Sequence, residues 1–241
     1  MLKFAPFITI YDFEASRDIQ NEVIWTFSIY LKGVASTRQR FNIQIVDQIE
    51  KERTFLKGSI KSVWKYYSIE GFNAVKKEAQ KILLLDLITS CLLDVSEELS
   101  WNEQAILEAK EYALKQDLQF QYCTKMTSNK SGDTMARIQL ELKQDKLLIW
   151  VEFFDKNNTL LSKKQLIETH PFQLAVFRRF EKPHWIDPER FGFQFKNGLT
   201  LNLSQQDEKG IWNNVQSELD EVFIKQLDRN DNLSFKELAN W

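Results

Sequence analysis

Apolar residues alternate with polar ones at three places within the first fifty residues. The segments Trp25 to Leu31, Phe41 to Ile45 and Phe7 to Phe13 each carry apolar side chains at every second position. Successive side chains of a β-strand point to opposite faces, so this period of two predicts strands with one buried and one solvated face. Such strands are typical of antiparallel sheets, and we expect an antiparallel sheet at the start of the chain.

The middle of the chain repeats apolar residues at helical spacing. Phe72 to Val95 predicts a long helix. The sequence Ser100-Trp101-Asn102-Glu103 matches a capping box and predicts the start of a second helix that extends through Leu114. Residues 51–70 are rich in aromatic side chains and fit more than one structure; we expect a helix there.

Alternation returns in the second half of the chain. The expected elements are strands at 118–122, 138–142, 146–154 and 159–168, a short helix at 172–180 and a C-terminal helix at 211–227. Between the two expected helices, Phe191 to Phe195 and Leu199 to Leu203 alternate on either side of Asn197-Gly198. An Asn-Gly pair between two alternating segments is typical of a tight β-hairpin.

These elements together predict an α+β fold with antiparallel sheets, a central helical pair and a C-terminal helix. We expect residues 1–100 to form N-terminal strands followed by helices, and residues 101–241 to form a helix, antiparallel strands, a hairpin and a C-terminal helix. The boundary is soft, and a single domain is the alternative. From this boundary onwards the order helix, strands, helix, hairpin, helix resembles the αβββαββα order of the type III secretion chaperone fold.

Composition narrows the class of protein. Of 241 residues, 43% are hydrophobic and 27% charged, as in ordinary globular proteins, and the formal net charge is −2. This charge argues against a nucleic-acid footprint over the whole chain, although a local basic patch stays open, and we expect no nucleic-acid partner. The longest apolar stretch, 82–93, is interrupted by Asp86 and is too short to cross a bilayer, so we expect no membrane contact.

Cysteine usage and the first residues of the chain predict a cytoplasmic location. Cys91 and Cys123 have no CxxC partner, and we expect two buried free thiols in a reducing compartment. Residues 1–6 lack the apolar core and cleavage site of a secretory signal.

Glycine is scarce and falls almost entirely at turns. Of seven glycines only Gly192 lies inside an expected strand, and none forms part of a GxGxxG or GxxxxGK[ST] phosphate-binding loop. A GxSxG nucleophile motif is also absent. These absences argue against the usual nucleotide-binding and serine-nucleophile enzymes, and we expect no cofactor.

Both histidines and three of the four prolines lie between His170 and Pro188. Imidazole and carboxylate groups of His170, His184, Asp187 and Glu189 could bind a metal or exchange protons, but their spacing matches no metal signature and we expect no metal. The structural alternative is that His170-Pro171 ends a strand and Asp187-Pro188 starts a turn or a helix.

The same stretch also contains a basic and aromatic group of side chains. Arg178, Arg179, His184 and Trp185 are our candidate binding residues, because exposed arginine and tryptophan are favoured at interaction hot spots. The alternative is a solvated helix face beside core aromatic residues.

Two further segments resemble known metal-binding motifs. Asp133 and Glu141-Leu142-Lys143 resemble a nuclease motif, but eight strand residues separate the carboxylates by about 26 Å, which is too far for one shared ion. Asp228 to Glu237 resembles a calcium loop, but it has ten positions instead of twelve and lacks the central glycine. An Asx-rich turn before a capped helix is the alternative for this segment.

The leading hypothesis is a non-enzymatic cytosolic protein that binds another protein, such as a bacterial toxin-neutralising immunity protein or a secretion chaperone. The alternative is a metal-assisted or histidine-dependent hydrolase with its site in residues 170–190. The sequence favours the first and leaves the second open. The oligomeric state and the identity of any partner are not determined by these patterns.

Overall fold

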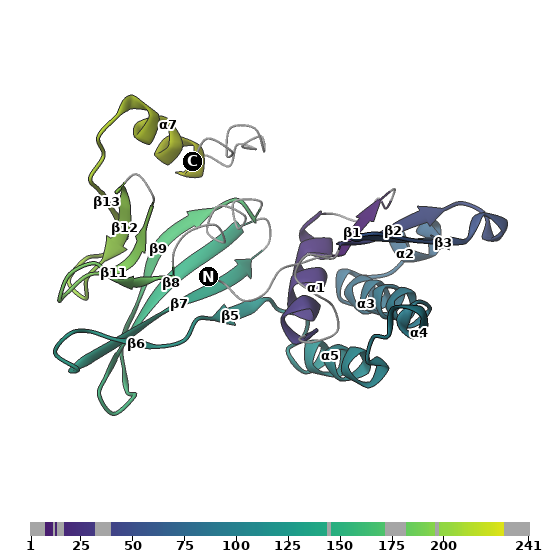
Figure 1. Ribbon diagram of the computed structural model, residues 1–241, viewed down its shortest axis with the longest axis horizontal. Coiled ribbons are helices and arrows are strands. Elements are labelled where there is room, and N and C mark those ends of the chain that lie inside the picture. Colours follow the sequence, from purple (N-terminus) through teal and green to yellow (C-terminus); the bar gives the residue numbers. More distant parts are fainter. Residues whose placement is uncertain are drawn as a thin grey trace. The chain divides into compact units, whose positions relative to one another are not determined.

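The computed structural model describes residues 8–11, 13, 17–31, 40–143, 146–171, 182–195 and 198–228 (Figure 1). The chain forms two compact units, residues 4–120 and residues 121–241. Helices and antiparallel sheets are both present and a helix follows the last strand, which confirms the expected α+β class. The division between the units falls after Phe120, so the expected boundary after residue 100 lies inside the first unit.

The first unit contains one four-stranded sheet and a layer of helices. Its elements are β1 (Ile8–Tyr11), α1 (Arg17–Tyr30), β2 (Arg40–Val46), the short 3-10 helix η1 (Ile49–Lys51), β3 (Arg53–Lys57), β4 (Ile60–Tyr66), α2 (Ile69–Asn73), α3 (Lys77–Leu93), α4 (Ser96–Leu99) and α5 (Glu103–Lys115). The strand order is β1-β2-β4-β3. β1, β2 and β4 run parallel to one another, and β3 pairs antiparallel with β4. The sheet is therefore mixed, and the expected antiparallel pairing holds only for its β3–β4 hairpin.

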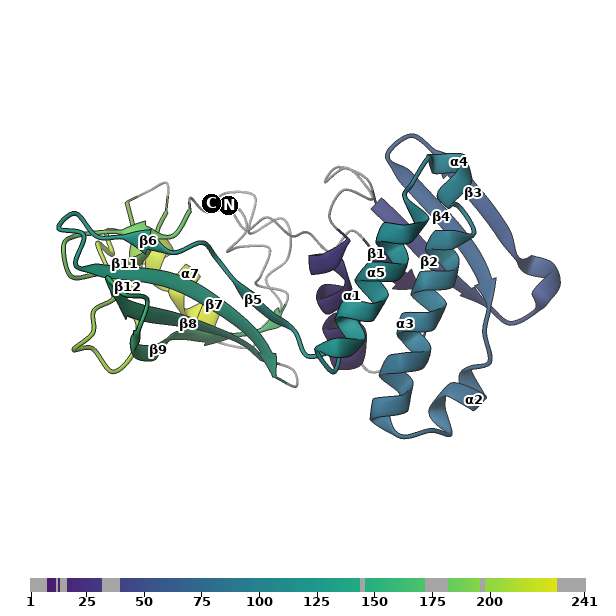
Figure 2. The same cartoon turned by 90° about the horizontal axis from the view of Figure 1, so that it is seen from below.

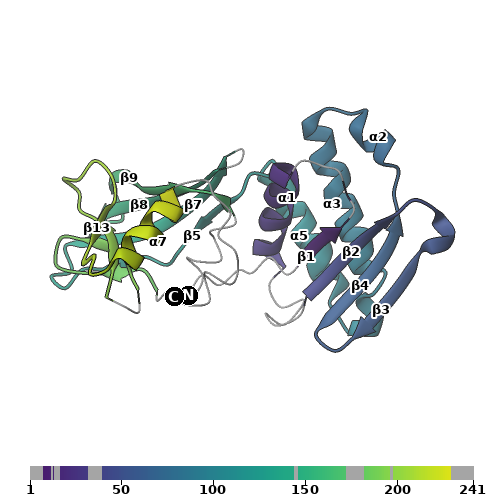
Figure 3. The ribbon, with the colours of Figure 1, turned by 90° about the horizontal axis from the view of Figure 1, so that it is seen from above.

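Helices α1, α3 and α5 lie side by side over one face of this sheet (Figure 2). The side chains that β1 and β2 place on that face are buried, namely Ile8, Ile10, Phe41, Ile43 and Ile45. The ring of Phe41 meets that of Trp101, just before α5, edge to face with centroids 5.8 Å apart. Burial of one side of β1 and β2, together with Val63 of β4, forms the core of the first unit. Among the described residues, no helical layer covers the other side of the sheet (Figure 3).

Two expectations in the first unit are wrong. The Trp25 to Leu31 segment belongs to helix α1, not to a strand. Every residue from Val23 to Ile29 is buried, so this helix needs apolar or small side chains on nearly all sides. The apolar residues at every second position are part of that all-round burial and are not evidence of a strand. Residues 51–70 form mainly the β3–β4 hairpin instead of a helix; Gly58, at a φ of +58°, lies in the turn between the strands.

The helical prediction for the middle of the chain is confirmed with changed boundaries. The single helix expected over 72–95 is divided into α2 and α3. The second expected helix corresponds to α5, but its cap is Asn102, whose side-chain oxygen accepts a hydrogen bond from the Ala105 N–H at 3.2 Å. Ser100, the expected cap, adopts a left-handed φ of 53° before the helix begins.

The second unit contains two antiparallel sheets and one helix. Its elements are β5 (Gln121–Cys123), β6 (Thr127–Ser128), β7 (Thr134–Lys143), β8 (Lys146–Asp155), β9 (Leu160–Thr169), β10 (His184–Trp185), β11 (Phe191–Gln194), β12 (Thr200–Leu203), β13 (Ile211–Asn213) and α7 (Glu218–Asp228). One sheet has the order β5-β7-β8-β9, with β6 beside β7, and the other has the order β10-β11-β12-β13.

The hairpin expected around Asn197-Gly198 is confirmed by the pairing of β11 with β12, and Gly198 adopts a φ of +87°. The helix expected over 211–227 is confirmed only in its second half, because residues 211–213 form β13. Helix α7 packs onto the second unit through Phe223, whose ring contacts that of Phe195 with centroids 5.6 Å apart. The helix expected over 172–180 lies outside the described residues. Within the described ranges, no helix is both long and apolar enough to cross a bilayer.

Candidate functional site

Of the four candidate binding residues, two can be placed. Arg178 and Arg179 lie outside the described residues. His184 and Trp185 form β10, which pairs with β11 through Gly192 and Phe191. The predicted assembly of these four side chains into one surface therefore stays a prediction.

Trp185 is anchored within the second unit. Its ring meets Phe191 edge to face, with centroids 5.4 Å apart, and lies 6.0 Å from Phe153 of β8. Its indole N–H donates to the Thr127 carbonyl oxygen at 2.9 Å. These contacts link strands of both sheets, so the visible role of this half-buried ring is in packing.

The neighbouring polar residues form a turn. The Nδ1 atom of His184 lies 3.0 Å from the Lys182 carbonyl oxygen, and because a carbonyl can only accept, Nδ1 carries the proton of this bond. One carboxylate oxygen of Asp187 accepts from the backbone N–H groups of Glu189 and Arg190, at 2.9 and 2.8 Å. The turn expected to start at Asp187-Pro188 is therefore present.

No metal centre is visible in the described part of the chain, where no group of three or more histidine, cysteine, aspartate or glutamate side chains is placed to hold an ion. Strand β7 runs without a break from Thr134 to Lys143, which keeps Asp133 and Glu141 apart as expected. The calcium-like segment after Asp228 lies outside the described residues.

The two cysteines differ in environment. Cys91 is buried, as expected, and desolvation raises the pKa of its thiol to about 12, which keeps it protonated near neutral pH. Cys123 is exposed, so the expectation that both thiols are buried is wrong. Strand β5 has only three residues and lies at one edge of its sheet, where a side chain can point to solvent.

A buried carboxylate on β8 is already matched by cations. Glu152 is 6% exposed, and its two oxygens lie 2.6 Å from Arg137 Nε and 3.9 Å from Lys163 Nζ. These opposite charges compensate one another across β7, β8 and β9. The cluster therefore has a structural role and shows no ligand site.

A different surface, on the first unit, has the composition of a binding site. It is the side of the β1-β2-β4-β3 sheet that α1, α3 and α5 do not cover, and we call it the open face. The strand registers place its side chains in four rows: Val46 and Tyr66; Tyr11, Gln44, Trp64 and Arg53; Thr9, Asn42, Ser62 and Phe55; and Arg40, Ile60 and Lys57. Adjacent positions in a row are about 5 Å apart and successive rows about 7 Å apart.

The open face exposes large aromatic and aliphatic side chains. Tyr11, Phe55, Ile60 and Tyr66 are 47%, 46%, 46% and 42% exposed. The half-buried Trp64 lies among them, and its ring is 5.5 Å from that of Phe55 between centroids. Isolated exposed apolar side chains are ordinary, but a contiguous group on a rigid sheet indicates an interaction site.

The open face is also cationic. Arg40, Arg53 and Lys57 are exposed, and none makes an ion pair with a described residue. The guanidinium of Arg53 lies 5.8 Å from the centre of the Trp64 ring, within the range of a cation–π contact. None of the described strand positions on this face is acidic. The local charge is therefore positive although the chain as a whole is slightly acidic.

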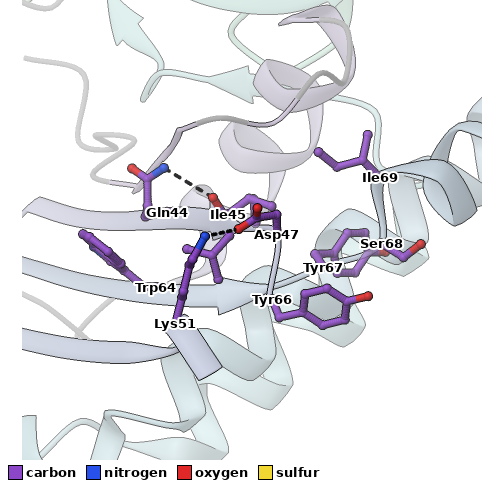
Figure 4. Close-up of a pocket in the computed structure, with 10 residues that line it drawn as sticks. Gln44, Ile45, Asp47, Lys51, Trp64, Tyr66, Tyr67, Ser68 and Ile69 are labelled. Atoms are coloured by element: carbon purple, nitrogen blue, oxygen red, sulfur yellow. Dashed lines mark hydrogen bonds and ion pairs between the residues drawn. The ribbon is translucent and has the colours of Figure 1, made fainter. Parts of the chain in front are cut away.

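A depression of about 750 Å³ adjoins the open face at the carboxyl ends of the parallel strands β2 and β4. Gln44, Val46, Trp64 and Tyr66 of the open face contribute to its lining, together with Asp47 and Lys51 (Figure 4). Lys51 Nζ lies 2.7 Å from Asp47 Oδ1, and this hydrogen bond lowers the pKa of the Asp47 carboxyl. The carboxyl ends of parallel strands are a common place for ligands in α/β sheets.

The sequence patterns did not single out this surface because its residues come from four strands, two of which were expected to be helical. The alternation in 41–45 indicated polar positions at Asn42 and Gln44. Their neighbours across the sheet could be identified only from the register. The aromatic residues of 51–70 were visible in the sequence. Because a helix was expected there, they could not be placed together on one face of a sheet.

No protein-family model matches this chain, and comparisons with curated proteins and with solved structures found no match either.

Proposed function

We propose that this chain is a non-enzymatic binding protein that engages a macromolecular partner with the open face. The observation that carries the proposal is the contiguous exposure of Tyr11, Phe55 and Tyr66 around Trp64 on one side of a sheet whose other side is packed. Tyrosine, tryptophan and arginine are the side chains most enriched at binding hot spots, and all three occur here.

The sheet gives these side chains a rigid support. Seven consecutive residue pairs join β2 to β4, and five join β3 to β4, so the side chains project from a continuous hydrogen-bonded backbone. Burial of the β1 and β2 side chains on the other face, which the three helices cover, fixes these strands further. A surface ordered before binding loses little conformational entropy when a partner docks.

The sequence favoured a protein as the partner. A role as an immunity protein or a secretion chaperone is a more specific proposal within that class. The open face supports the broader statement that a large partner is bound. A surface that spans four strands, with rings at both edges, suits an extended contact better than a small molecule held in a closed cavity.

A matched pair of variants tests the open face as the recognition surface. Phe55→Ala with Tyr66→Ala removes two exposed rings from it, whereas Leu107→Ala with Tyr112→Ala removes side chains that are 41% and 51% exposed on α5. Each immobilised protein would be exposed to the same cell extract after circular dichroism has shown that it is folded. We expect about tenfold weaker capture by the first variant only. Equal capture by both variants and the unchanged protein would contradict the proposal.

A further inference from the structure

The arrangement of rings and charges on the open face bears on the chemical class of the partner. We propose that the occupant of the open face is single-stranded nucleic acid, which stacks its bases on the aromatic rings and places its phosphates beside the cations. This inference rests on the proposed function, since it names the ligand of the same surface.

The rings form a continuous path across two strands. Phe55 on β3 lies 5.5 Å from Trp64 on β4, and Tyr66 is the next residue on the same side of β4, about 7 Å further along. Exposures of 46% for Phe55 and 42% for Tyr66 leave much of each side chain accessible. Unpaired bases stack on aromatic side chains presented in this way, whereas the bases of a duplex have no free faces.

One cation lies beside the path of rings, and two lie in the row next to its end. Arg53 shares a row with Trp64, and Lys57 lies two positions from Phe55 on the same strand. Arg40 lies in the same row as Lys57, on the far side of β4. The central part of a protein–protein interface is usually depleted of lysine and enriched in arginine, so Lys57 fits such an interface less well than the two arginines. Cations beside and at one end of the rings can contact the phosphates of a strand whose bases stack on those rings, and this favours nucleic acid over a protein surface.

The charge balance supports the same choice. The open face carries three cations, and the described strand positions on it hold no carboxylate, while the formal net charge of the chain is −2. Two carboxylates next to the strands of the open face, Asp47 and Glu52, are engaged: Asp47 pairs with Lys51, and Glu52 Oε1 accepts from the Tyr66 backbone N–H at 3.0 Å. A polyanion therefore meets attraction on this face that a neutral or basic partner would not.

The polar groups between the rings can contact base edges. Asn42 and Gln44 occupy adjacent rows on β2, and amide side chains both donate and accept hydrogen bonds. Gln44 also borders the depression next to Trp64 and Tyr66, which offers space for a base at one end of the path (Figure 4).

Fluorescence anisotropy with labelled oligonucleotides tests the inference on the full chain. The probes are a 20-nucleotide oligo(dT), a 20-nucleotide oligo(U) and a 20-base-pair DNA duplex, each measured between 50 and 200 mM salt. We expect both single strands to bind at least tenfold more tightly than the duplex. The ratio of oligo(U) to oligo(dT) affinity shows whether RNA or DNA is preferred.

Two variants separate stacking from charge. Phe55→Ala with Tyr66→Ala should weaken binding by about tenfold per ring and keep the salt dependence. Arg40→Gln with Arg53→Gln and Lys57→Gln should weaken binding at low salt and reduce the slope of log affinity against log salt by about two, since each phosphate contact with a single strand contributes about 0.7. Lys76→Gln with Lys77→Gln and Lys115→Gln removes the same charge from the helical layer and should change the slope little.

The possible outcomes distinguish this inference from the proposed function. Absence of oligonucleotide binding, or binding that both open-face variants leave unchanged, overturns the inference. If capture from the cell extract then survives nuclease treatment and still depends on Phe55 and Tyr66, the partner is a protein and the proposed function stands. If capture does not depend on these rings either, both proposals fail.

Discussion

At the scale of single residues, the same residue type has different roles in the two units. Trp185 donates its indole N–H to Thr127 and packs on two phenylalanine rings, so its contacts are internal. Trp64 lies under an arginine on an uncovered sheet face. Tryptophan suits both environments because it combines a large apolar ring with one polar group. The neighbours of each ring therefore decide its role, and two neighbours of Trp185, Thr127 and Phe153, come from distant parts of the sequence.

Trp185→Phe tests whether this residue acts in packing. The substitution keeps an aromatic ring and removes the hydrogen bond to Thr127, so we expect the free energy of unfolding of the second unit to fall by about 1 kcal/mol. Urea denaturation followed by circular dichroism measures this change. An unchanged stability combined with lost capture of a partner would instead assign Trp185 to recognition, as the sequence predicted.

At the scale of elements, Gly192 shows how closely two strands can approach. A Cβ atom added to Gly192 would lie 2.1 Å from the Leu201 carbonyl oxygen and 2.6 Å from the Asn202 Cα atom, both on β12. Glycine within a strand often marks such a contact with another backbone. Neither strand can move away freely, because β12 is also paired with β13.

Gly192→Ala should therefore destabilise the second unit by about 3 kcal/mol, at the upper end of the cost of overpacking. Gln194→Ala is the matched control, since Gln194 is an exposed residue of the same strand and its loss should cost less than about 0.5 kcal/mol. Thermal unfolding of the two variants gives the comparison. Similar stabilities would show that the β11–β12 pair relaxes more easily than its geometry indicates.

The elements also show which parts of the fold the sequence could predict. Strands β7, β8 and β9 and the Asn-Gly hairpin followed from local alternation and turn chemistry, because each has one continuous pattern. Helix α1 did not, since burial on nearly all sides removes the contrast on which periodicity depends. The parallel pairing of β1, β2 and β4 depends on crossover connections that no local pattern encodes. The residues of the open face can be recognised as neighbours only when this parallel pairing is known, so the sequence alone did not predict the open face.

At the scale of the whole molecule, each unit has its own sheet, helix and buried apolar residues. A unit with its own core can unfold on its own. A change deep in one core therefore does not have to destabilise the other.

We expect two unfolding transitions, and we expect Gly192→Ala to lower the midpoint of only one of them. Hydrogen exchange at increasing denaturant, resolved by peptide, assigns each transition: amides of β11 and β12 should lose protection early in the variant, and amides of β2 and β4 should not change. A single transition in which all four strands lose protection together would show that the units are energetically coupled.

The position of β3 at the edge of its sheet has a consequence for solubility. An edge strand presents backbone groups that can pair with a strand of another molecule, and β3 carries the apolar residues Phe55 and Leu56 at its centre. Arg53 and Lys57 lie at its two ends, where like charges on two approaching copies repel each other. The two cations of β3 that we propose to contact the ligand therefore also oppose self-association of the free protein, and their neutralisation would favour aggregates wherever no partner covers the strand.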